Sequence, residues 1–116
     1  MKICRAITVL ALFPISLLIG CQDLDLPEGT PYCIEKRIRK FNRNEACDAG
    51  ASVVRYDFQG RTIYIFNPGI CGADLSSAVV DRECNNVCSL GGLAGNVICD
   101  GDTISEAINE EVIWSN

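Results

Sequence analysis

The chain has 116 residues, a formal net charge of −5, eight cysteines and no histidine. The acidic balance argues against binding to nucleic acid and against electrostatic docking on anionic lipid, because both of those partners carry phosphate charge. The absence of histidine excludes imidazole general base catalysis and histidine-ligated metals.

Residues 1–20 have the parts of a secretory signal. Lys2 and Arg5 supply a positive start, and residues 6–19 form an apolar run shorter than the roughly 20 residues that a membrane-spanning helix needs. The run ends in Leu-Ile-Gly-Cys at residues 18–21, which resembles the lipobox of bacterial lipoproteins. The resemblance implies cleavage before Cys21, a diacylglycerol on its sulfur and an acyl chain such as palmitate on its nitrogen. An ordinary cleaved signal or an uncleaved anchor is the alternative.

Residues 21–30 are expected to form a lipidated tether, because they are polar, acidic and interrupted by proline and glycine. Two or three acyl chains hold a protein durably, since each buried methylene contributes about 0.8 kcal/mol. We therefore predict a location on the outer membrane or cell surface, with the protein attached to the membrane and not embedded in it. Gln22 is not the aspartate that accompanies inner-membrane retention in enterobacterial lipoproteins. Asp23 and Asp25 resemble a surface-export signal of Bacteroidota lipoproteins, although two acids in a solvated tether explain them equally well.

The remaining residues, 31–116, are expected to fold as a single small domain stapled by disulfides. Cys4 leaves with the signal and Cys21 takes the lipid. Six cysteines then remain, and an even number in a small exported domain is typical of a disulfide framework. They are Cys33, Cys47, Cys71, Cys84, Cys88 and Cys99. We expect Cys33 to pair with Cys47 and the other four to pair among themselves; a zinc or redox site is disfavoured because paired CxxC motifs are missing.

Thr30-Pro31 predicts the start of a helix, with Thr30 as N-cap and Pro31 at the first helical position. Ile34, Ile38 and Phe41 follow at helical spacing, and the helix is expected to end within residues 42–44. The rest of the helix surface is basic and carries Lys36, Arg37, Arg39, Lys40 and Arg43. We interpret these cations as a solvated face, with a partner-binding patch as the alternative.

Residues 52–58 and 61–66 give the clearest strand pattern, because both are rich in β-branched and aromatic residues. Gln59-Gly60 lies between them, and Gly60 can adopt the positive φ of a tight hairpin or of a bulge after a type I turn. Both registers stay open. The second arm is apolar on both faces, which predicts a central strand covered by the helix on one side.

The C-terminal half is expected to be largely irregular. Its patterns favour a short helical turn over 74–80, a short strand over 97–99, a helical segment over 103–109 and a last strand over 111–115. The predicted fold class is therefore α+β, with one N-terminal helix packed on a small antiparallel sheet and a long disulfide-stapled loop.

Several of these motifs together resemble a group of small uncharacterised lipoproteins of Bacteroidota. The resemblance rests on the lipobox, the cysteine-containing helix, the hairpin of residues 56–66 and the Cys-Gly-Ala-Asp loop of residues 71–74. The Leu-Gly-Gly stretch at 90–96 and Val-Ile-Trp at 112–114 complete it. It implies a lipid-anchored single domain, and it carries over no activity and no catalytic residue.

No constellation of catalytic or metal-binding residues stands out, so we expect no enzyme, no cofactor and no metal. Asp100-Gly101-Asp102 has the spacing with which a calcium loop begins, but Ile104 stands where the next oxygen ligand would be needed. A turn is the better interpretation.

The favoured function is a non-enzymatic binding or accessory module of the cell envelope, with a protein or a glycan as partner. Tyr56, Tyr64 and Trp114 are the contact candidates, and packing in the core or sheet is their alternative role. The alternative function is an inhibitor of a protease or another hydrolase, acting through a disulfide-braced loop between Cys84 and Cys99.

Overall fold

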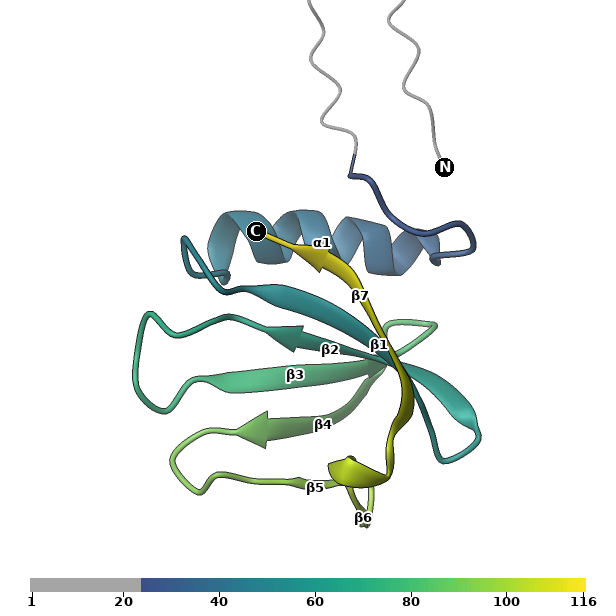
Figure 1. Ribbon diagram of the computed structural model, residues 1–116, viewed down its shortest axis with the longest axis vertical. Coiled ribbons are helices and arrows are strands. Elements are labelled where there is room, and N and C mark those ends of the chain that lie inside the picture. The colour runs from purple at the N-terminus through teal and green to yellow at the C-terminus, as the bar shows by residue number, and fades with distance from the viewer. Residues whose placement is uncertain (1–23) are drawn as a thin grey trace, which may run out of the picture.

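The computed structural model describes residues 24–116, which form one helix lying across one face of a five-stranded antiparallel sheet (Figure 1). The strand order is β4-β3-β2-β1-β7. The elements are α1 (Tyr32–Asn44), β1 (Ser52–Phe58), β2 (Arg61–Asn67), β3 (Ser76–Asp81), β4 (Asn86–Gly91), the small ribbon β5 (Ile98–Cys99) and β6 (Asp102–Thr103), the 3-10 turn η1 (Ile104–Glu106) and β7 (Ile108–Ser115). The α+β class is confirmed. The predicted signal and Cys21 lie outside the described residues.

The predicted helix is present, with a different start. Ile34, Ile38 and Phe41 are buried on its inner side, as their spacing predicts. Pro31 occupies the N-cap position instead of Thr30, and the Thr30 hydroxyl donates to the carbonyl of Pro27 at 2.7 Å. The helix stands at residues 32–44 and not at the N-terminus of the chain.

The sheet is buried on both faces. On the helix side, Tyr64 and Phe66 of β2 pack with the inner face of α1. On the other side, Ile63 of β2 packs with Val79 and Cys99, and the segment around η1 covers them. The prediction that the second hairpin arm is a central strand under the helix is confirmed, and this two-sided burial explains why that arm is apolar on both faces.

The β1–β2 hairpin closes with a two-residue loop. Phe58 pairs with Arg61, and the two loop residues both have positive φ, 52° at Gln59 and 74° at Gly60. That combination is a type I′ turn, which matches the twist of the flanking strands. Of the two registers left open by the sequence, the tight hairpin is the one that forms.

The predicted long loop after β2 is wrong, because two strands occupy much of it. Residues 76–81 form β3 and not a helical turn. The physical reason is that Val79 and Val80 are buried on opposite faces of the sheet, an alternation that a strand provides and a helix does not. The predicted helical segment over 103–109 shortens to η1, because β7 begins at Ile108.

The predicted disulfide pairing is also wrong. The bonds are Cys33–Cys84, Cys47–Cys71 and Cys88–Cys99. Cys33 lies in the first turn of α1, and the rise along the helix places it about 16 Å from Asn44, the last helical residue. Cys47 follows in the next loop, where its backbone N–H bonds to Pro68 and its sulfur is paired with Cys71.

The chain enters the domain on the side of α1. Leu24 and Leu26, within the predicted tether, pack against the core that α1 covers. None of the helices in residues 24–116 is long and apolar enough to cross a membrane.

Candidate interaction surface

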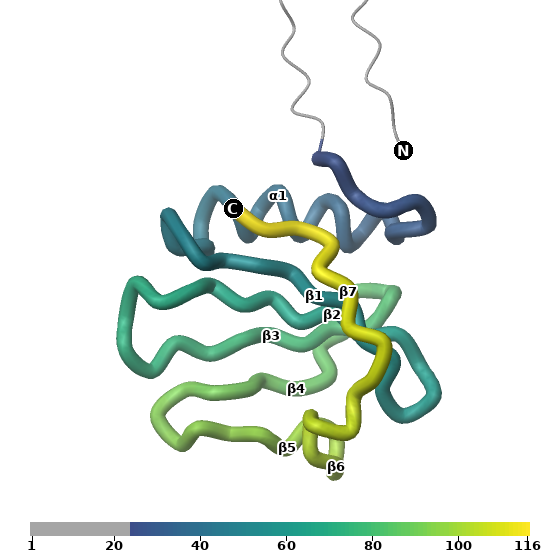
Figure 2. Tube along the Cα trace, viewed as in Figure 1, coloured from purple at the N-terminus to yellow at the C-terminus, as the bar shows by residue number. Residues whose placement is uncertain are grey.

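Three loops at one end of the sheet are joined into a single rim (Figure 2). They are residues 45–51 between α1 and β1, residues 68–75 between β2 and β3, and residues 92–97 between β4 and β5. We call them the loop rim. The Cys47–Cys71 disulfide joins the first two loops, and the Gly92 N–H donates to the carbonyl of Leu75 at 3.3 Å to join the third.

Short-range contacts brace the rim further. The Cys47 N–H donates to the carbonyl of Pro68 at 2.8 Å, which adds a second link between the first two loops. Gly69 has a φ of 103° and passes so close to Ala49 that a Cβ there would lie 2.8 Å from its carbonyl oxygen. The rim conformation is therefore set by a disulfide, hydrogen bonds and close backbone packing.

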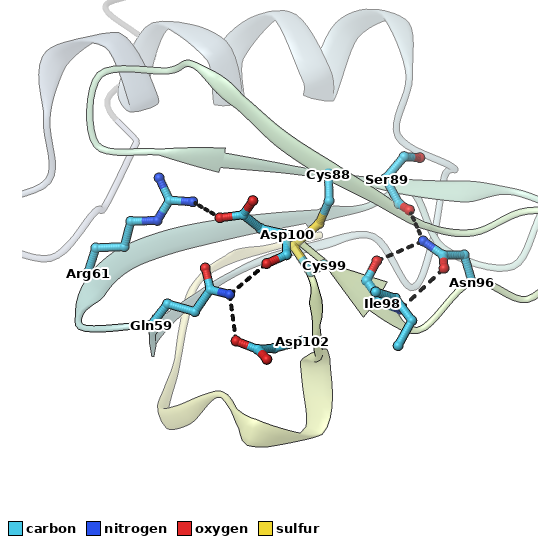
Figure 3. The surroundings of a disulfide bond; sticks show 9 residues. All are labelled: Gln59, Arg61, Cys88, Ser89, Asn96, Ile98, Cys99, Asp100 and Asp102. Atoms are coloured by element: carbon cyan, nitrogen blue, oxygen red, sulfur yellow. Dashed lines mark hydrogen bonds and ion pairs between the residues drawn. A yellow bond between two sulfur atoms is a disulfide. The ribbon is translucent and has the colours of Figure 1, made fainter.

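The third loop is held by Asn96 (Figure 3). Its side-chain amide donates to the carbonyls of Ser89 at 2.8 Å and Ile98 at 2.9 Å, and its backbone exchanges hydrogen bonds with Gly91. The Cys88–Cys99 disulfide closes the base of the same loop. The tip of this loop is therefore held by the Asn96 hydrogen bonds and by the disulfide at its base.

Large apolar side chains project from this rigid rim. Ile70 is 92% exposed and Leu93 is 90% exposed, while Leu75, which joins their two loops, is 41% exposed. Single exposed apolar residues are common, but a group of them on adjoining loops is typical of an interaction site. Two acidic residues, Asp48 and Asp74, are exposed on the first two loops of the rim.

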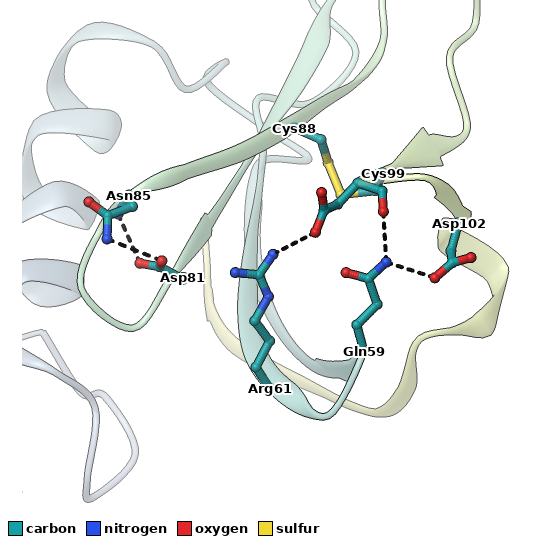
Figure 4. A network of polar contacts seen from close by, with 8 residues as sticks. Gln59, Arg61, Asp81, Asn85, Cys88, Cys99 and Asp102 are labelled. Atoms are coloured by element: carbon teal, nitrogen blue, oxygen red, sulfur yellow. Dashed lines mark hydrogen bonds and ion pairs between the residues drawn. A yellow bond between two sulfur atoms is a disulfide. The ribbon is translucent and has the colours of Figure 1, made fainter.

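A cluster of polar side chains lies away from the loop rim and has a structural role (Figures 3 and 4). The Gln59 amide donates to the carbonyl of Asp100 at 2.8 Å and to the carboxylate of Asp102 at 2.7 Å. Arg61 forms an ion pair with Asp100 at 3.2 Å. These contacts tie the tip of the β1–β2 hairpin to the turn between β5 and β6, next to Cys99. The carboxylates of that turn thus serve as acceptors for side chains of the protein.

The β3–β4 turn is organised by a single carboxylate. Asp81 accepts the backbone N–H groups of Glu83 and Asn85, each at 2.9 Å, and the Asn85 side-chain amide at 3.2 Å (Figure 4). These bonds, led by the one from the Asn85 backbone, hold the pKa of Asp81 below its ordinary value of 3.8. Because Asp81 is already engaged, we interpret it as a turn-forming residue.

The aromatic contact candidates do not form an exposed patch. Tyr64 is only 1% exposed and belongs to the core under α1, so of the two roles considered for it the structure has core packing and not surface contact. Trp114 is half-buried and packs edge-on against Phe41 at 5.9 Å between ring centres. Tyr56 is half-buried against the opposite core. Burial raises the pKa of both tyrosines, which keeps their hydroxyls neutral.

Within residues 24–116 no charged or polar residue is buried. A shallow hollow of about 420 Å³ lies beside β7 and is lined by Leu24, Asp25 and the residues of 112–115. Its one charged group is the exposed Asp25. The hollow therefore does not bring together the pair of carboxylates that sugar hydrolysis would require.

All six cysteines predicted to pair do so, and they are distributed over three separate parts of the fold. The residues of the loop rim were missed by the sequence reasoning. Ile70 and Leu93 are isolated apolar residues flanked by glycine or proline, and their only signal was an apolar side chain in a segment otherwise read as turn.

The geometry defines a small, disulfide-stapled sheet domain with a rigid apolar loop end. Residues 39–116 match DUF6970, a domain of unknown function, and since the match covers more than half of the chain, the protein belongs to this family. No curated protein and no solved structure matches the chain. The expected likeness to an uncharacterised family is supported at this level, and the lipoprotein character and the Bacteroidota source of the family stay predictions.

Proposed function

We propose that this protein is a lipid-anchored module of the outer membrane or cell surface that binds a partner protein through its loop rim and has no catalytic activity of its own. The observation that carries the proposal is the near-complete exposure of Ile70 and Leu93 on loops that are braced on both sides. Several exposed apolar side chains on adjoining loops are typical of an interaction site, because soluble domains rarely expose extended apolar patches.

The bracing of the rim loops favours binding because it lowers the entropy lost on association. Ordering a flexible loop on association weakens affinity, whereas loops fixed beforehand avoid that loss. The rim is fixed by one disulfide across its first two loops and another at the base of its third. Aliphatic tips can be desolvated in the core of a protein interface, which is its most apolar part, so a protein partner is favoured over a glycan.

The lipid anchor is supported by the sequence of residues 1–21, with its positive start, apolar run and lipobox-like end. Cys21 precedes the first described residue by only three positions. An anchored domain would meet partners in the same membrane or its surroundings at a high effective concentration, so a modest rim would suffice for binding.

An inhibitor of a protease or another hydrolase remains the second candidate, and the Leu93 loop favours it. This loop lies between Cys84 and Cys99, it protrudes, and Asn96 braces it. However, Gly92 and Gly95 both have positive φ and fold the tip into a tight turn. An extended segment that could lie along a protease cleft is therefore not what this loop presents.

The rim is tested by capture of cross-linked partners from intact cells. Wild type is compared with Leu93→Asp and Ile70→Asp, and with the matched control Val112→Asp, whose side chain is 55% exposed on β7. We expect a partner that is enriched with wild type and with Val112→Asp and is lost, by about tenfold or more, with the two rim variants. Equal recovery with all four proteins would show that the rim is not the binding site. A partner that proves to be a hydrolase inhibited by wild type would select the second candidate.

The anchor is tested separately by the intact mass of the mature protein. A mass that begins at Cys21 and includes a diacylglycerol is expected. A mature protein that begins elsewhere, or that carries no acyl chain, would remove the lipid anchor from the proposal.

A further inference from the structure

The outer side of α1 carries a row of cations. Lys36, Lys40 and Arg43 recur at helical spacing on the side opposite the buried residues, and all three are exposed. We call Lys36, Lys40 and Arg43 the basic stripe. Among residues 24–116 these three form no ion pair. Their charge therefore faces solvent without a partner in the domain.

The other cations of α1 are used within the domain. Arg39 forms an ion pair with Glu35 at 3.3 Å, and the Arg37 guanidinium lies 5.4 Å from the ring centre of Phe66. The helix thus divides its positive charge between an inner set, which packs, and the basic stripe, which does not.

The predicted lipid attachment lies on the same side of the domain as the basic stripe. Leu24 and Leu26 pack on the core under α1, and the described chain begins beside that helix (Figure 1). Cys21 is three residues before Leu24, and three residues of chain span at most about 10 Å. A lipid on Cys21 would therefore hold Leu24 within about 10 Å of the headgroups, which is close to the screening length of charges at physiological salt. Because the core on which Leu24 packs is the one that α1 covers, the helix would lie on the membrane-facing side of the domain.

We propose that the basic stripe rests on anionic headgroups of the membrane that carries the lipid anchor, so that the lipid and the stripe together fix the orientation of the domain. This inference rests on the lipid anchor of the proposed function. The overall acidic charge, which argues against docking on anionic lipid, does not decide the matter, because the positive charge is concentrated on one helix. Exposed Asp25 and Glu28 oppose the attraction, so the stripe orients an anchored domain and does not bind a membrane unaided.

This orientation has a consequence for the loop rim. The rim begins directly after the C-terminal end of α1, at one end of the sheet (Figure 2). With α1 lying along the membrane, the rim faces sideways along the membrane plane. A partner held in the same membrane is then within reach of Ile70 and Leu93.

The chain permits a direct test, because its lysines are Lys2, in the predicted signal, and Lys36 and Lys40, both in the basic stripe. The mature lipidated protein is reconstituted in vesicles of phosphatidylcholine alone or with about 30% phosphatidylglycerol. An uncharged amine-acylating reagent is added, and modification of Lys36 and Lys40 is followed by peptide mass spectrometry. We expect about threefold slower labelling in the anionic vesicles, with the difference removed in 1 M NaCl.

The control variant removes the attraction and keeps the attachment. In Lys40→Glu/Arg43→Glu, Lys36 stays at the same distance from the anchor, and we expect it to be labelled at the same rate in both kinds of vesicle. Arg61→Glu, which reverses a charge at the tip of the β1–β2 hairpin, should label like wild type. If Lys36 of the double variant is still labelled more slowly in anionic than in neutral vesicles, the charges of Lys40 and Arg43 do not cause the protection, and the proposed role of the stripe is wrong.

The outcomes separate this inference from the proposed function. Acylated protein that stays with both kinds of vesicle and labels at equal rates in them would overturn the orienting role of the stripe and leave the anchored module intact. A mature protein without acyl chains would overturn the anchor and, with it, the orientation proposed here.

Discussion

Gly60 and Gly69 both have positive φ, but their surroundings differ. At Gly60 an added Cβ would meet nothing within 4 Å, whereas at Gly69 it would lie 2.8 Å from the carbonyl oxygen of Ala49. Gly60→Ala should therefore lower the free energy of unfolding only through the strain of an alanine at positive φ, by about 1 kcal/mol. Gly69→Ala should cost about 2–4 kcal/mol, because the first rim loop must also move. Urea unfolding of the two variants measures both values. Equal losses would show that the close approach of the two rim loops does not exist in solution.

Asp81 should make the β3–β4 turn sensitive to acid. Its pKa is lowered in the folded state, mainly by the Asn85 backbone N–H, so its carboxylate stabilises the fold above the ordinary value of 3.8. That contribution disappears as the pH falls through the lowered value. Between about pH 5 and pH 2, the urea midpoint of wild type should fall further than that of Asp81→Asn, whose side chain does not titrate. The same decrease in both proteins would show that this carboxylate keeps its ordinary pKa.

At the scale of the elements, α1 and the β1–β2 hairpin could be predicted because each has a clear period and a recognisable end. The helix spacing of Ile34, Ile38 and Phe41 had no competing interpretation. β3 could not be predicted, because its apolar part is short and its burial is two-sided. Val79 and Val80 reveal a strand only once β2 and the cover on the far face are in place.

The loop rim was beyond the reach of the sequence for a different reason. Its formation depends on the contact between loops far apart in the chain, such as Cys47 with Cys71 and Leu75 with Gly92. Local patterns contain no information on such contacts. The pairing of Cys33 with Cys47 was already unfavourable at the sequence level, because the predicted helix places most of its length between them and a disulfide needs Cα atoms within about 7 Å.

The three disulfides should differ in their contributions to stability. Cys33–Cys84 joins residues 51 apart and ties α1 to the β3–β4 turn, whereas Cys88–Cys99 joins residues only 11 apart. Since a longer closed loop loses more entropy in the unfolded chain, replacing both cysteines by alanine should cost about 4 kcal/mol for the first pair and about 3 kcal/mol for the second. Chemical unfolding of the two double variants gives the order. A larger loss for Cys88–Cys99 would show that native packing around buried Cys99, and not loop closure, dominates.

For the whole molecule, the sheet forms the two cores, and two of the disulfides hold in place the segments that cover them. The sheet brings together two separate cores, one under α1 and one under the segment of β5 and η1. The covering segments are short, and each is fastened by a disulfide: α1 by Cys33–Cys84 and β5 by Cys88–Cys99. A domain of this size buries a modest core, so these links decide whether the covers stay in place.

The intact domain should therefore depend on an oxidising environment. Domains of this kind are stable by about 5–15 kcal/mol, and three disulfides at about 3–4 kcal/mol each account for most of such a margin. Complete reduction of the six cysteines should release α1 and the β5–η1 segment and leave a largely unfolded chain, with amide signals collapsed into the narrow range of random coil. The measurement is a two-dimensional amide NMR spectrum before and after reduction under non-denaturing conditions, with thiol alkylation and mass to prove that all three bonds are open. In a second sample that is reduced but not alkylated, removal of the reductant and reoxidation should restore the dispersed spectrum. A dispersed spectrum from the fully alkylated protein would mean that the two cores hold α1 and the β5–η1 segment without the disulfides. The disulfides would then no longer be an argument for the proposed exported location.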